Sequence, residues 1–384
     1  MEFIDELNQW PKERVQALLD EVTLEDVERA LHSEQSSPRD LAALLSPCAR
    51  DRLEAMARKG RRLTRWHFGR TIALYAPIYL SNVCGSDCTY CGFAARSGSK
   101  LKRLTLSHDD IRRECEALSK RGFEAVLLLT GDAPRVAPVS FIAEAVGIAR
   151  EYFASVSVEV YAMDQADYGV LCDAGLEGVT LYMETYDRET YAKVHLAGKK
   201  MDFGYRLDAL ERAGKAGARR LNLGALLGLF DWRLDGFWMG LHARHMQHTC
   251  WQSAIALSFP RLHHTPDRFK APCLLTDAEL VQLMLAMRLF LPEVGFSMST
   301  RETPALRDHL IPLGVTHMSA GSSTRPGGYA TSGDETLEQF AIEDHRTPEV
   351  VVEAIRRAGY DPVWKDFDHA FTGGAVIGRN VSRR

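Results

Sequence analysis

The 384-residue sequence lacks both long hydrophobic runs and a strong charge of either sign. No stretch reaches the roughly 18 consecutive apolar residues that a membrane-spanning helix needs. The N-terminal segment MEFIDELNQW is acidic and interrupted by polar side chains, so we expect no secretory signal. A formal net charge of −4 gives no field that would attract nucleic acid or an anionic membrane. We therefore expect a cytoplasmic protein that binds neither.

Several common motifs are also missing. The sequence contains no GxGxxG, P-loop or GxSxG pattern, which argues against the usual phosphate-binding loops and the nucleophile turn of α/β-hydrolases. His242, His245 and His248 recur at every third position, but no HExxH pattern accompanies them, so we expect an ordinary polar helix face. The basic run Lys100–Arg103 is expected to be a solvated surface rather than a polyanion site.

From about residue 73 the sequence alternates between strand-like and helical patterns. Eight apolar strand-like runs occur: ALYAPIYL, AVLLLTGD, SVSVEVYAM, GVTLYMETY, RRLNLGALLGL, IALSFPRL, GFSMSTRE and VTHMSAGSS. Eight strands with intervening helices over roughly 250 residues match a (β/α)8 TIM-type barrel. A doubly wound open sheet is the alternative. Most polar residues of interest follow the strands, where barrels place their chemistry.

Residues 1–70 are expected to form an N-terminal helical extension, residues 71–330 the barrel, and residues 331–384 a short C-terminal extension. Ser37, Ser107 and Thr276 each precede a helical pattern as N-caps. The segment 201–217, MDFGYRLDALERAGKAG, predicts one helix that ends at Gly217.

The C-terminal extension carries a helix signal at Thr347-Pro348, followed by the aromatic stretch PVWKDFDHAF. Its Trp364, Phe367 and Phe371 need burial, so we expect the extension to pack on the barrel.

Three of the eight cysteines, Cys84, Cys88 and Cys91, crowd into the loop SNVCGSDCTYCGF after the first strand. Without a signal sequence, cysteines indicate a reducing compartment and metal or catalytic roles. A structural zinc site would need four ligands, whereas an iron–sulfur cluster held by three thiolates keeps one iron open for a small molecule. Incidental cysteines, or zinc bound with a remote histidine, are the alternatives.

The segment CGSDCTYCGF resembles the CxxxCxΦC motif of radical S-adenosylmethionine enzymes (Φ is an aromatic residue). The resemblance implies that Cys84, Cys88 and Cys91 ligate a [4Fe–4S] cluster whose open iron binds S-adenosylmethionine. Further blocks in order, among them RLTR, METY, SFPRL, STRE, PGGYA and PVWKD, are similar to the ThiH family along essentially the whole chain. That family comprises the tyrosine lyases, or 2-iminoacetate synthases, of thiamine thiazole biosynthesis.

The resemblance implies cleavage of the Cα–Cβ bond of L-tyrosine to 2-iminoacetate and p-cresol, with 5′-deoxyadenosine and methionine formed from the cofactor. The resemblance further implies that the adenosyl radical removes a hydrogen atom from the substrate amino group. A related tryptophan-type radical lyase is one alternative, and a non-catalytic iron–sulfur module is another. The related lyase of hydrogenase assembly has C-terminal cysteines for a second cluster, whereas this chain has none after Cys273.

The resemblance also implies a group of cofactor-binding residues near the strand ends: Tyr90, Gly131, Asp132, Glu159, Glu184, Arg206 and Arg261. Asp132 would receive the ammonium group of S-adenosylmethionine, with one methylene less than the glutamate usual in the family. Glu184 would accept the ribose hydroxyls, and Arg206 would pair with the carboxylate. Taken alone, Gly131-Asp132 also fits a strand-ending turn, and Glu159 also fits a buried ion pair with an arginine.

Arg301, in STRE after the seventh strand, is expected to hold the substrate carboxylate, because a guanidinium binds a carboxylate through two parallel hydrogen bonds. Ser319 and Ser322 would help to seat the amino group. An ion pair of Arg301 with Glu302 is the alternative. Arg261 is placed to serve either ligand.

The implied partners, besides the substrate L-tyrosine, are two proteins. Delivery to the thiazole synthase ThiG would protect 2-iminoacetate from hydrolysis, and a flavodoxin- or ferredoxin-type donor would supply the electron.

Overall fold

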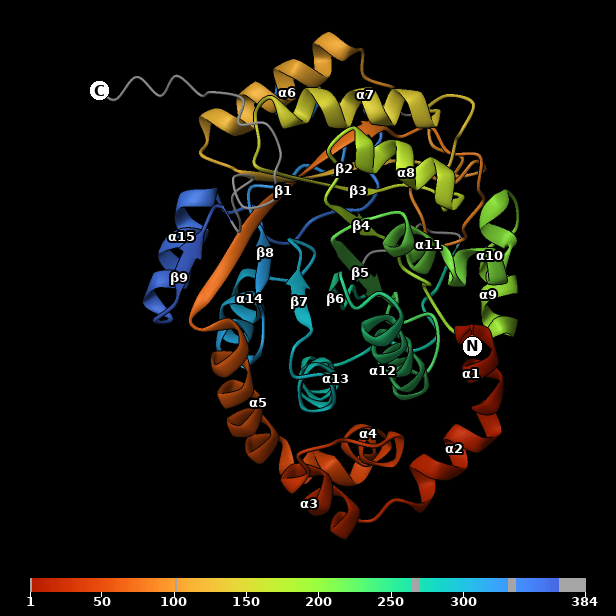
Figure 1. Cartoon of the computed structure of the whole chain (residues 1–384), viewed down its shortest axis with the longest axis vertical. Helices are drawn as coiled ribbons and strands as arrows, with labels where there is room; N and C mark the ends of the chain where they lie inside the picture. The colour runs from red at the N-terminus through yellow and green to blue at the C-terminus, as the bar shows by residue number, and fades with distance from the viewer. Residues whose placement is uncertain (1, 101, 264–268, 331–335, 366–384) are drawn as a thin grey trace.

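The computed structural model describes residues 2–100, 102–263, 269–330 and 336–365, and it contains a closed parallel barrel (Figure 1). Strand β1 pairs with both β2 and β8, and the remaining strands pair in sequence order, so the sheet closes on itself. This confirms the barrel and rules out the open sheet. The strands are β1 (Thr71–Ser81), β2 (Ala125–Thr130), β3 (Ser155–Glu159), β4 (Gly178–Thr180), β5 (Arg220–Gly224), β6 (Ala254–Ser258), β7 (Gly295–Met298) and β8 (His317–Ser319).

The helices of the barrel lie in the connections between its strands, as expected for a TIM-type fold. They are α6 (His108–Lys120), α7 (Val139–Arg150), α8 (Gln165–Asp173), α9 (Arg188–Val194), α10 (Phe203–Leu207), α11 (Ala209–Lys215), α12 (Trp232–Thr249), α13 (Asp277–Phe290) and α14 (Pro304–Leu310), with the 3₁₀ turns η2 (Lys199–Met201) and η3 (Ile311–Leu313). Ser107 and Thr276 form capping boxes with Asp110 and Glu279, which confirms both helix starts. The single helix predicted over 201–217 is wrong, because the chain leaves the helix at Asp208 between α10 and α11.

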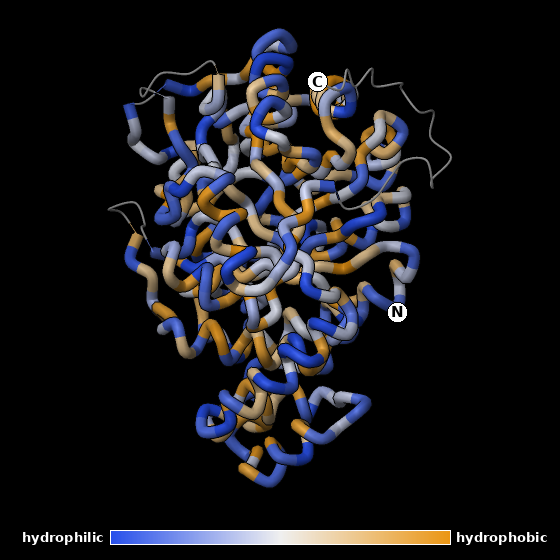
Figure 2. Tube along the Cα trace, turned by 90° about the vertical axis from the view of Figure 1, so that its left-hand side faces the viewer, coloured by the Kyte–Doolittle hydropathy of each residue, from blue (hydrophilic) through white to orange (hydrophobic). Residues whose placement is uncertain are grey.

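The N-terminal helices are α1 (Phe3–Gln9), α2 (Lys12–Glu21), α3 (Leu24–His32), α4 (Pro38–Leu45), η1 (Pro47–Arg52) and α5 (Leu53–Phe68). Helices α2, α3 and α4 lie at the lower end of the molecule in Figure 1, with α1 and α5 above them on either side. Figure 2, turned about the vertical axis, shows the N-terminus near mid-height. Helix α4 packs on α12 and α13, and Leu41 and Leu44 belong to the same buried core as Phe237 and Met284. The predicted polar face of α12 is wrong at His242, which is buried and stacks on Phe3 with ring centroids 4.2 Å apart.

The C-terminal extension adds α15 (Pro348–Arg357) and a ninth strand, β9 (Asp361–Val363), which pairs with β1 outside the barrel. Trp364 packs edge-on against Phe123 at 5.2 Å between ring centroids and lines a cavity near the amino ends of the strands. The expected packing of Trp364 is therefore confirmed, whereas Phe367 and Phe371 lie outside the described residues.

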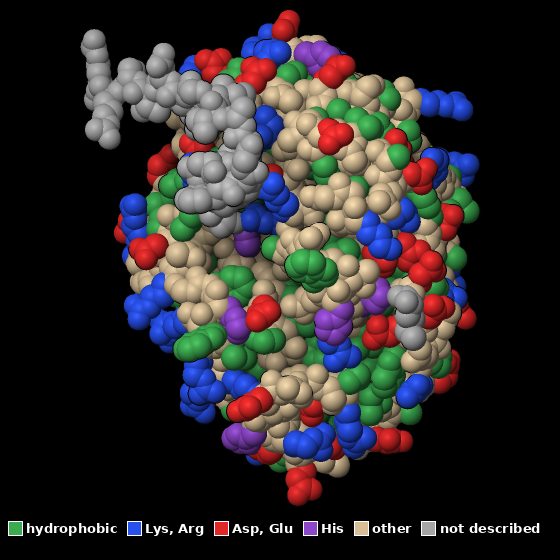
Figure 3. Space-filling view, in the orientation of Figure 1, with side chains coloured by type: hydrophobic (Ala, Val, Ile, Leu, Met, Phe, Trp, Pro, Cys, Tyr) green, Lys and Arg blue, Asp and Glu red, His purple; other side chains and the backbone are tan. Residues whose placement is uncertain are grey.

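Two properties of the surface and helices agree with the composition. In the part of the chain that the structure describes, no helix has the length and hydrophobicity needed to span a membrane. Acidic and basic side chains intermingle on the face shown in Figure 3, as the small net charge suggests.

Candidate active site

Two adjoining cavities lie where the barrel strands end. The first, here called the thiol cavity, encloses about 660 Å³ and is lined by Cys84, Cys88 and Cys91. The second, the arginine cavity, encloses about 980 Å³ and is lined by Arg301. We treat the two cavities as one continuous site, because the same residues line both: Tyr79, Cys91, Leu129, Glu159, Tyr182, Glu184, Lys200 and Gln339.

Backbone contacts fold the cysteine loop over the end of β2. The Gly85 amide donates to the Asp132 carbonyl at 2.7 Å, and the Thr89 amide donates to the Val194 carbonyl at 2.9 Å. A Cβ atom on Gly131 would lie 2.2 Å from the Val83 carbonyl oxygen, so this position requires glycine. The predicted Gly131-Asp132 turn thus has a defined purpose, which is the close approach of the loop.

Arg103 corrects the expectation of a solvated basic run. Its side chain is half-buried, and its guanidinium donates to the carbonyls of Asn82, Phe93 and Ala94. One cation therefore fixes both ends of the loop that carries the cysteines, while Lys100 and Lys102 remain exposed as predicted.

The three thiols are close enough to influence one another. Burial, followed by the neighbouring Cys88 and Cys84, raises the pKa of the Cys91 thiol to about 12. Burial likewise raises the pKa of Cys84 and Cys88. Deprotonating three buried neighbours requires a compensating cation, and thiolates around one cavity are the donor set of an iron–sulfur cluster. In the described ranges, no three His, Cys, Asp or Glu side chains are grouped to hold a single metal ion.

Charged groups also line the thiol cavity. Glu184 accepts a hydrogen bond from Lys200 Nζ at 2.6 Å and lies 3.6 Å from Arg206 Nη2. The backbone of Glu184 has a positive φ of 70°, a conformation that costs energy for a non-glycine residue and concentrates at functional sites. Asp132 accepts a hydrogen bond from Ser86 Oγ, so its carboxylate is tied to the cysteine loop.

Lys200 is the main functional residue that the sequence did not reveal. Burial and Arg206 lower its pKa, but Glu184 and Cys88 outweigh them and raise it above the ordinary value, so Lys200 stays charged. Two adjacent lysines in KKMDFGYR are an unremarkable pattern, and the fold alone separates buried Lys200 from exposed Lys199.

Arg301 enters the arginine cavity without an acidic partner in the described ranges. Its guanidinium carbon lies 3.6 Å from the centroid of the Phe340 ring, its Nε has no hydrogen-bond partner, and Nη1 reaches only the Arg261 carbonyl at 3.5 Å. Burial lowers the pKa of Arg301. A desolvated guanidinium of this kind is suited to bind a ligand carboxylate.

Arg261 lies elsewhere. Its guanidinium forms a two-point ion pair with Glu302 and also contacts Asp277 at 2.9 Å, and it lines neither cavity. Glu302, the alternative partner considered for Arg301, is thus engaged by Arg261, and it also accepts from His263 at 3.0 Å.

The two serines are held differently. Ser319 Oγ accepts a hydrogen bond from the Thr300 amide at 3.1 Å, whereas Ser322 Oγ is buried without a hydrogen-bond partner. Both line the arginine cavity, as does Tyr90, whose hydroxyl lies 2.8 Å from His195 Nε2.

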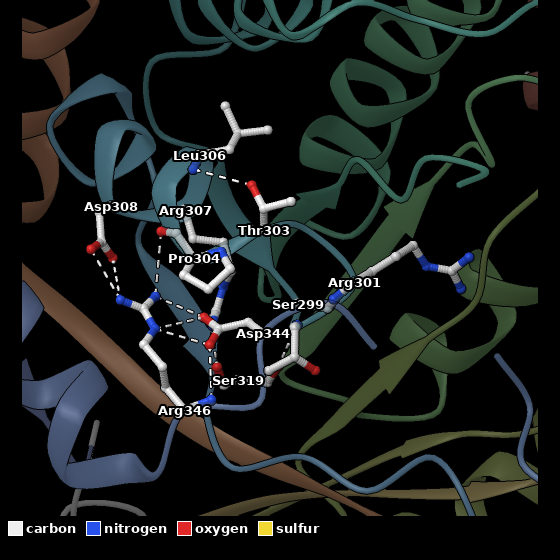
Figure 4. A network of polar contacts seen from close by, with 11 residues as sticks. Ser299, Arg301, Thr303, Pro304, Leu306, Arg307, Asp308, Ser319, Asp344 and Arg346 are labelled. Carbon is white, nitrogen blue, oxygen red and sulfur yellow. Dashed lines mark hydrogen bonds and ion pairs between the residues drawn. The ribbon is translucent and has the colours of Figure 1, made fainter. Parts of the chain in front are cut away.

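A buried ion network supports this wall of the arginine cavity (Figure 4). Arg307, fully buried, binds both the Asp344 carboxylate and the Ser319 carbonyl. Arg346 binds Asp344 and, at 2.9 Å, Asp308. The C-terminal extension therefore fixes the strand ends that carry Ser319 and Arg301.

Glu159 ends β3 and faces both cavities. Its carboxylate forms no hydrogen bond or ion pair with another described residue, so the ion pair considered from the sequence is not found. Burial, followed by the charge of Glu184, raises the pKa of Glu159 to about 7.

The fold thus brings most of the candidate residues together. The thiol cavity is lined by Cys84, Cys88, Cys91, Gly131, Asp132, Glu159, Glu184 and Arg206. The arginine cavity is lined by Tyr90, Arg301, Ser319 and Ser322, together with the shared residues.

Comparisons with known proteins agree with this arrangement. The sequence matches the Radical SAM superfamily over residues 78–236 and the Biotin and Thiamin Synthesis associated domain over residues 258–361. It is 44% identical to the 2-iminoacetate synthase of Salmonella typhimurium and 42% identical to that of Escherichia coli, in each case over 95% of this chain and 97% of the relative.

Solved structures add the same fold. The crystal structure of HydG, a maturase of the [FeFe]-hydrogenase, matches 92% of this chain and 80% of its own, with a TM-score of 0.86 and 29% identity. Methylornithine synthase (PylB) matches 88% of this chain and 97% of its own, with a TM-score of 0.69 and 22% identity, which is a likeness of fold.

Proposed function

The chain belongs to the 2-iminoacetate synthase family of the radical S-adenosylmethionine superfamily, and on that premise we propose how its own residues carry the reaction. The enzyme is a lyase that cleaves the Cα–Cβ bond of L-tyrosine to 2-iminoacetate and p-cresol for thiazole formation in thiamine biosynthesis. Its cofactors are a [4Fe–4S] cluster and S-adenosylmethionine. When bound and reduced, they supply a 5′-deoxyadenosyl radical that removes a hydrogen atom from the substrate.

Cys84, Cys88 and Cys91 hold the cluster. Their thiols line one cavity, and Cys84 and Cys91 pack against apolar Tyr79 and Phe93. Apolar packing limits the access of water to the cluster, while the charged side chains that line the same cavity suit a polar ligand.

Asp132, Glu184 and Arg206 bind S-adenosylmethionine in the thiol cavity. Gly131 lets the cysteine loop pack closely against the end of β2. Glu184 accepts hydrogen bonds from the ribose hydroxyls, because its ion pairs with Lys200 and Arg206 hold the carboxylate in place. Tyr90, which precedes Cys91 and lines the arginine cavity, contributes an aromatic wall, with Lys200 Nζ 5.7 Å from its ring centroid. Arg261, tied to Glu302, acts as a structural ion pair and takes no ligand.

Arg301 holds the carboxylate of L-tyrosine through its unpartnered guanidinium, and Ser322 Oγ supplies a further hydrogen bond. Ser319 shapes the same wall through its contact with the Thr300 amide. The observation that carries this proposal is the pair of adjoining cavities. The three cysteines line one of them, and the other is lined by Arg301, which forms no ion pair with a described residue.

Two protein partners complete the proposal. A flavodoxin- or ferredoxin-type protein supplies electrons, and the thiazole synthase ThiG accepts 2-iminoacetate, which hydrolyses readily in water. Cytoplasmic location is supported by the eight cysteines, none of which forms a disulfide. The division into residues 1–70, 71–330 and 331–384 also remains a proposal, because the second family match crosses residue 330.

The test uses anaerobically reconstituted enzyme with S-adenosylmethionine, reductant and L-tyrosine. We expect p-cresol and 5′-deoxyadenosine, and no 3-methylindole from L-tryptophan. Arg301→Gln should lower kcat/KM for L-tyrosine by about 10²-fold or more, because the buried carboxylate loses a charged two-point contact. The control Arg58→Gln, at an exposed site on α5, should match the wild type. Products from tryptophan alone, or no 5′-deoxyadenosine, would contradict the proposal.

A further inference from the structure

We propose that Glu159 binds the ammonium group of the substrate, takes a proton from it before cleavage, and returns that proton to the methyl carbon of p-cresol. This inference rests on the proposed function and departs from the cofactor role expected for Glu159 from the sequence.

The position of Glu159 fits a group that meets both ligands. Strand β3 ends at Glu159, and the side chain lines the thiol cavity and the arginine cavity alike. The titratable and charged groups that interact with it are Tyr75 and Tyr79 of β1, Tyr182 and Glu184 after β4, Lys200 of η2, Arg206 of α10, and Arg301 after β7. Asp132, which follows the neighbouring strand β2, and Cys91 also line the thiol cavity with Glu159.

The other acids near the two cavities are already engaged. Glu184 is paired with Lys200 and Arg206, and Asp132 is hydrogen-bonded to Ser86. Glu159 has no such partner among the described residues. An isolated carboxylate in a desolvated cavity is costly unless a ligand supplies the missing positive charge.

Arg301 lacks a negatively charged partner, because its guanidinium forms no ion pair with an acidic side chain of the described residues and its Nε has no hydrogen-bond partner. Glu159 and Arg301 line the same arginine cavity, and their charges affect each other's pKa. An α-amino acid zwitterion carries one carboxylate and one ammonium group on the same carbon, so it satisfies both side chains at once. This complementarity assigns the ammonium group to Glu159.

The same carboxylate is suited to move a proton. With a pKa raised to about 7 by burial and by Glu184, Glu159 can accept and release a proton near neutral pH, where general acid–base catalysis is most effective. The substrate needs this step, because its nitrogen is an ammonium at neutral pH, whereas hydrogen-atom removal that ends in an imine starts from the neutral amine.

The proton cycle balances. Glu159 Oε accepts H⁺ from the ammonium nitrogen, and the neutral amine then loses a hydrogen atom to the radical supplied by the cofactors. Breaking the Cα–Cβ bond gives 2-iminoacetate and a 4-hydroxybenzyl radical. That radical takes one electron from the flavodoxin- or ferredoxin-type donor and H⁺ from Glu159, which forms p-cresol and restores the carboxylate.

The first test measures binding without turnover. Cluster-loaded enzyme with S-adenosylmethionine and no reductant is titrated calorimetrically with L-tyrosine and with 3-(4-hydroxyphenyl)propionate, which lacks the amino group. We expect the wild type to bind L-tyrosine at least tenfold more tightly, and Glu159→Gln to lose that preference. Glu54→Gln, an exposed glutamate on α5, serves as the control and should keep it.

The second test follows pH and products. Wild-type kcat/KM should rise with pH through about 7 as the Glu159 carboxylate forms. At pH 7, Glu159→Gln should lose about 10²-fold or more in kcat/KM, as expected for removal of a general base. Its activity should recover at alkaline pH, where the amine is already neutral, and its yield of p-cresol per 5′-deoxyadenosine should fall.

A Glu159→Gln enzyme with unchanged ligand preference and pH profile would overturn the inference. So would weaker binding of S-adenosylmethionine with the preference for L-tyrosine intact, because Glu159 would then serve the cofactor. Failure of the wild type to form p-cresol would refute the proposed function instead, and the binding comparison would still decide the role of Glu159.

Discussion

Neighbouring residues of the same type have different roles here according to burial. Lys199 is exposed, whereas Lys200 reaches into the site and bonds to Glu184 at 2.6 Å. The sequence KK gives no means of choosing between them, because only the fold of the turn η2 places Lys200 at Glu184 and leaves Lys199 in solvent.

Lys200→Met should therefore destabilise the enzyme, whereas the matched Lys199→Met should not. Removing one partner of a buried pair leaves Glu184 with Arg206 alone, and we expect a loss of about 2 kcal/mol in the free energy of unfolding. The affinity for S-adenosylmethionine should fall with it. Denaturant titration and ligand binding measure both, and equal behaviour of the two variants would contradict the assigned role of Lys200.

Residue chemistry was predictable where the residue type itself restricts the function. Cysteine spacing predicted the cluster, and the family match supports that cofactor. The carboxylate role of Arg301 stays a prediction, which rests on the preference of guanidinium groups for carboxylates. Arg261 meets the same sequence criterion as Arg301. The difference is that Glu302 lies next to Arg261 in space, which the adjacent numbering of Arg301 and Glu302 obscured.

At the scale of elements, the cysteine loop depends on close contact with the end of β2. The register of β1 shifts between Tyr79 and Ser81, so a bulge redirects the chain just before the loop begins. Gly131 then admits the Val83 carbonyl at a distance that no side chain permits.

Gly131→Ala should prevent the loop from reaching its place. A Cβ atom 2.2 Å from a backbone oxygen forces a shift of β2 or of the loop, and we expect a loss of about 2–4 kcal/mol in stability together with poor retention of iron. Gly147→Ala is the control, because its added methyl meets no atom within 4 Å in α7 and alanine favours the helix. Iron content after desalting and the thermal midpoint test the contrast. A Gly131→Ala variant that retains iron like the control would count against it.

The regular elements followed from the sequence more readily than the irregular ones. Eight strands were visible because each is a run of apolar residues with helical patterns on either side. The break at Asp208 between α10 and α11 and the three-residue strand β9 were not, since neither has an apolar period of its own. Their conformations depend on contacts with distant parts of the chain.

Across the whole molecule, the C-terminal extension connects both halves of the site. The Gly92 amide donates to the Gln339 carbonyl, the Asn82 side chain donates to the Leu337 carbonyl at 2.9 Å, and Gln339 Oε1 accepts from Tyr79. A few residues later, Asp344 holds Arg307 beneath Ser319. The contacts of Leu337 and Gln339 join segments more than 200 residues apart, which explains why the sequence predicted a packed extension but not its part in the site.

Asp344→Asn should weaken the enzyme more than Asp308→Asn. Both aspartates bind Arg346, but Asp344 is fully buried with Arg307, so losing its charge should cost about 3–5 kcal/mol. The Asp308 side chain is 38% exposed, and its replacement should cost about 1 kcal/mol or less. Thermal denaturation ranks the two variants. A separate L-tyrosine binding assay should show weaker binding only for Asp344→Asn, since Ser319 moves with Arg307.

The placement of residues 336–346 has a consequence for the order of events in the cell. Until the ribosome has translated residues 336–346, the cysteine loop lacks the segment that packs against it. The residues around Ser319 likewise lack their ion pairs with Asp344 and Arg346. A nascent chain therefore presents three thiols on an unfinished, water-accessible surface. We infer that iron and sulfide are installed only after nearly the entire polypeptide has left the ribosome, so premature termination yields a protein without metal rather than a partly active enzyme.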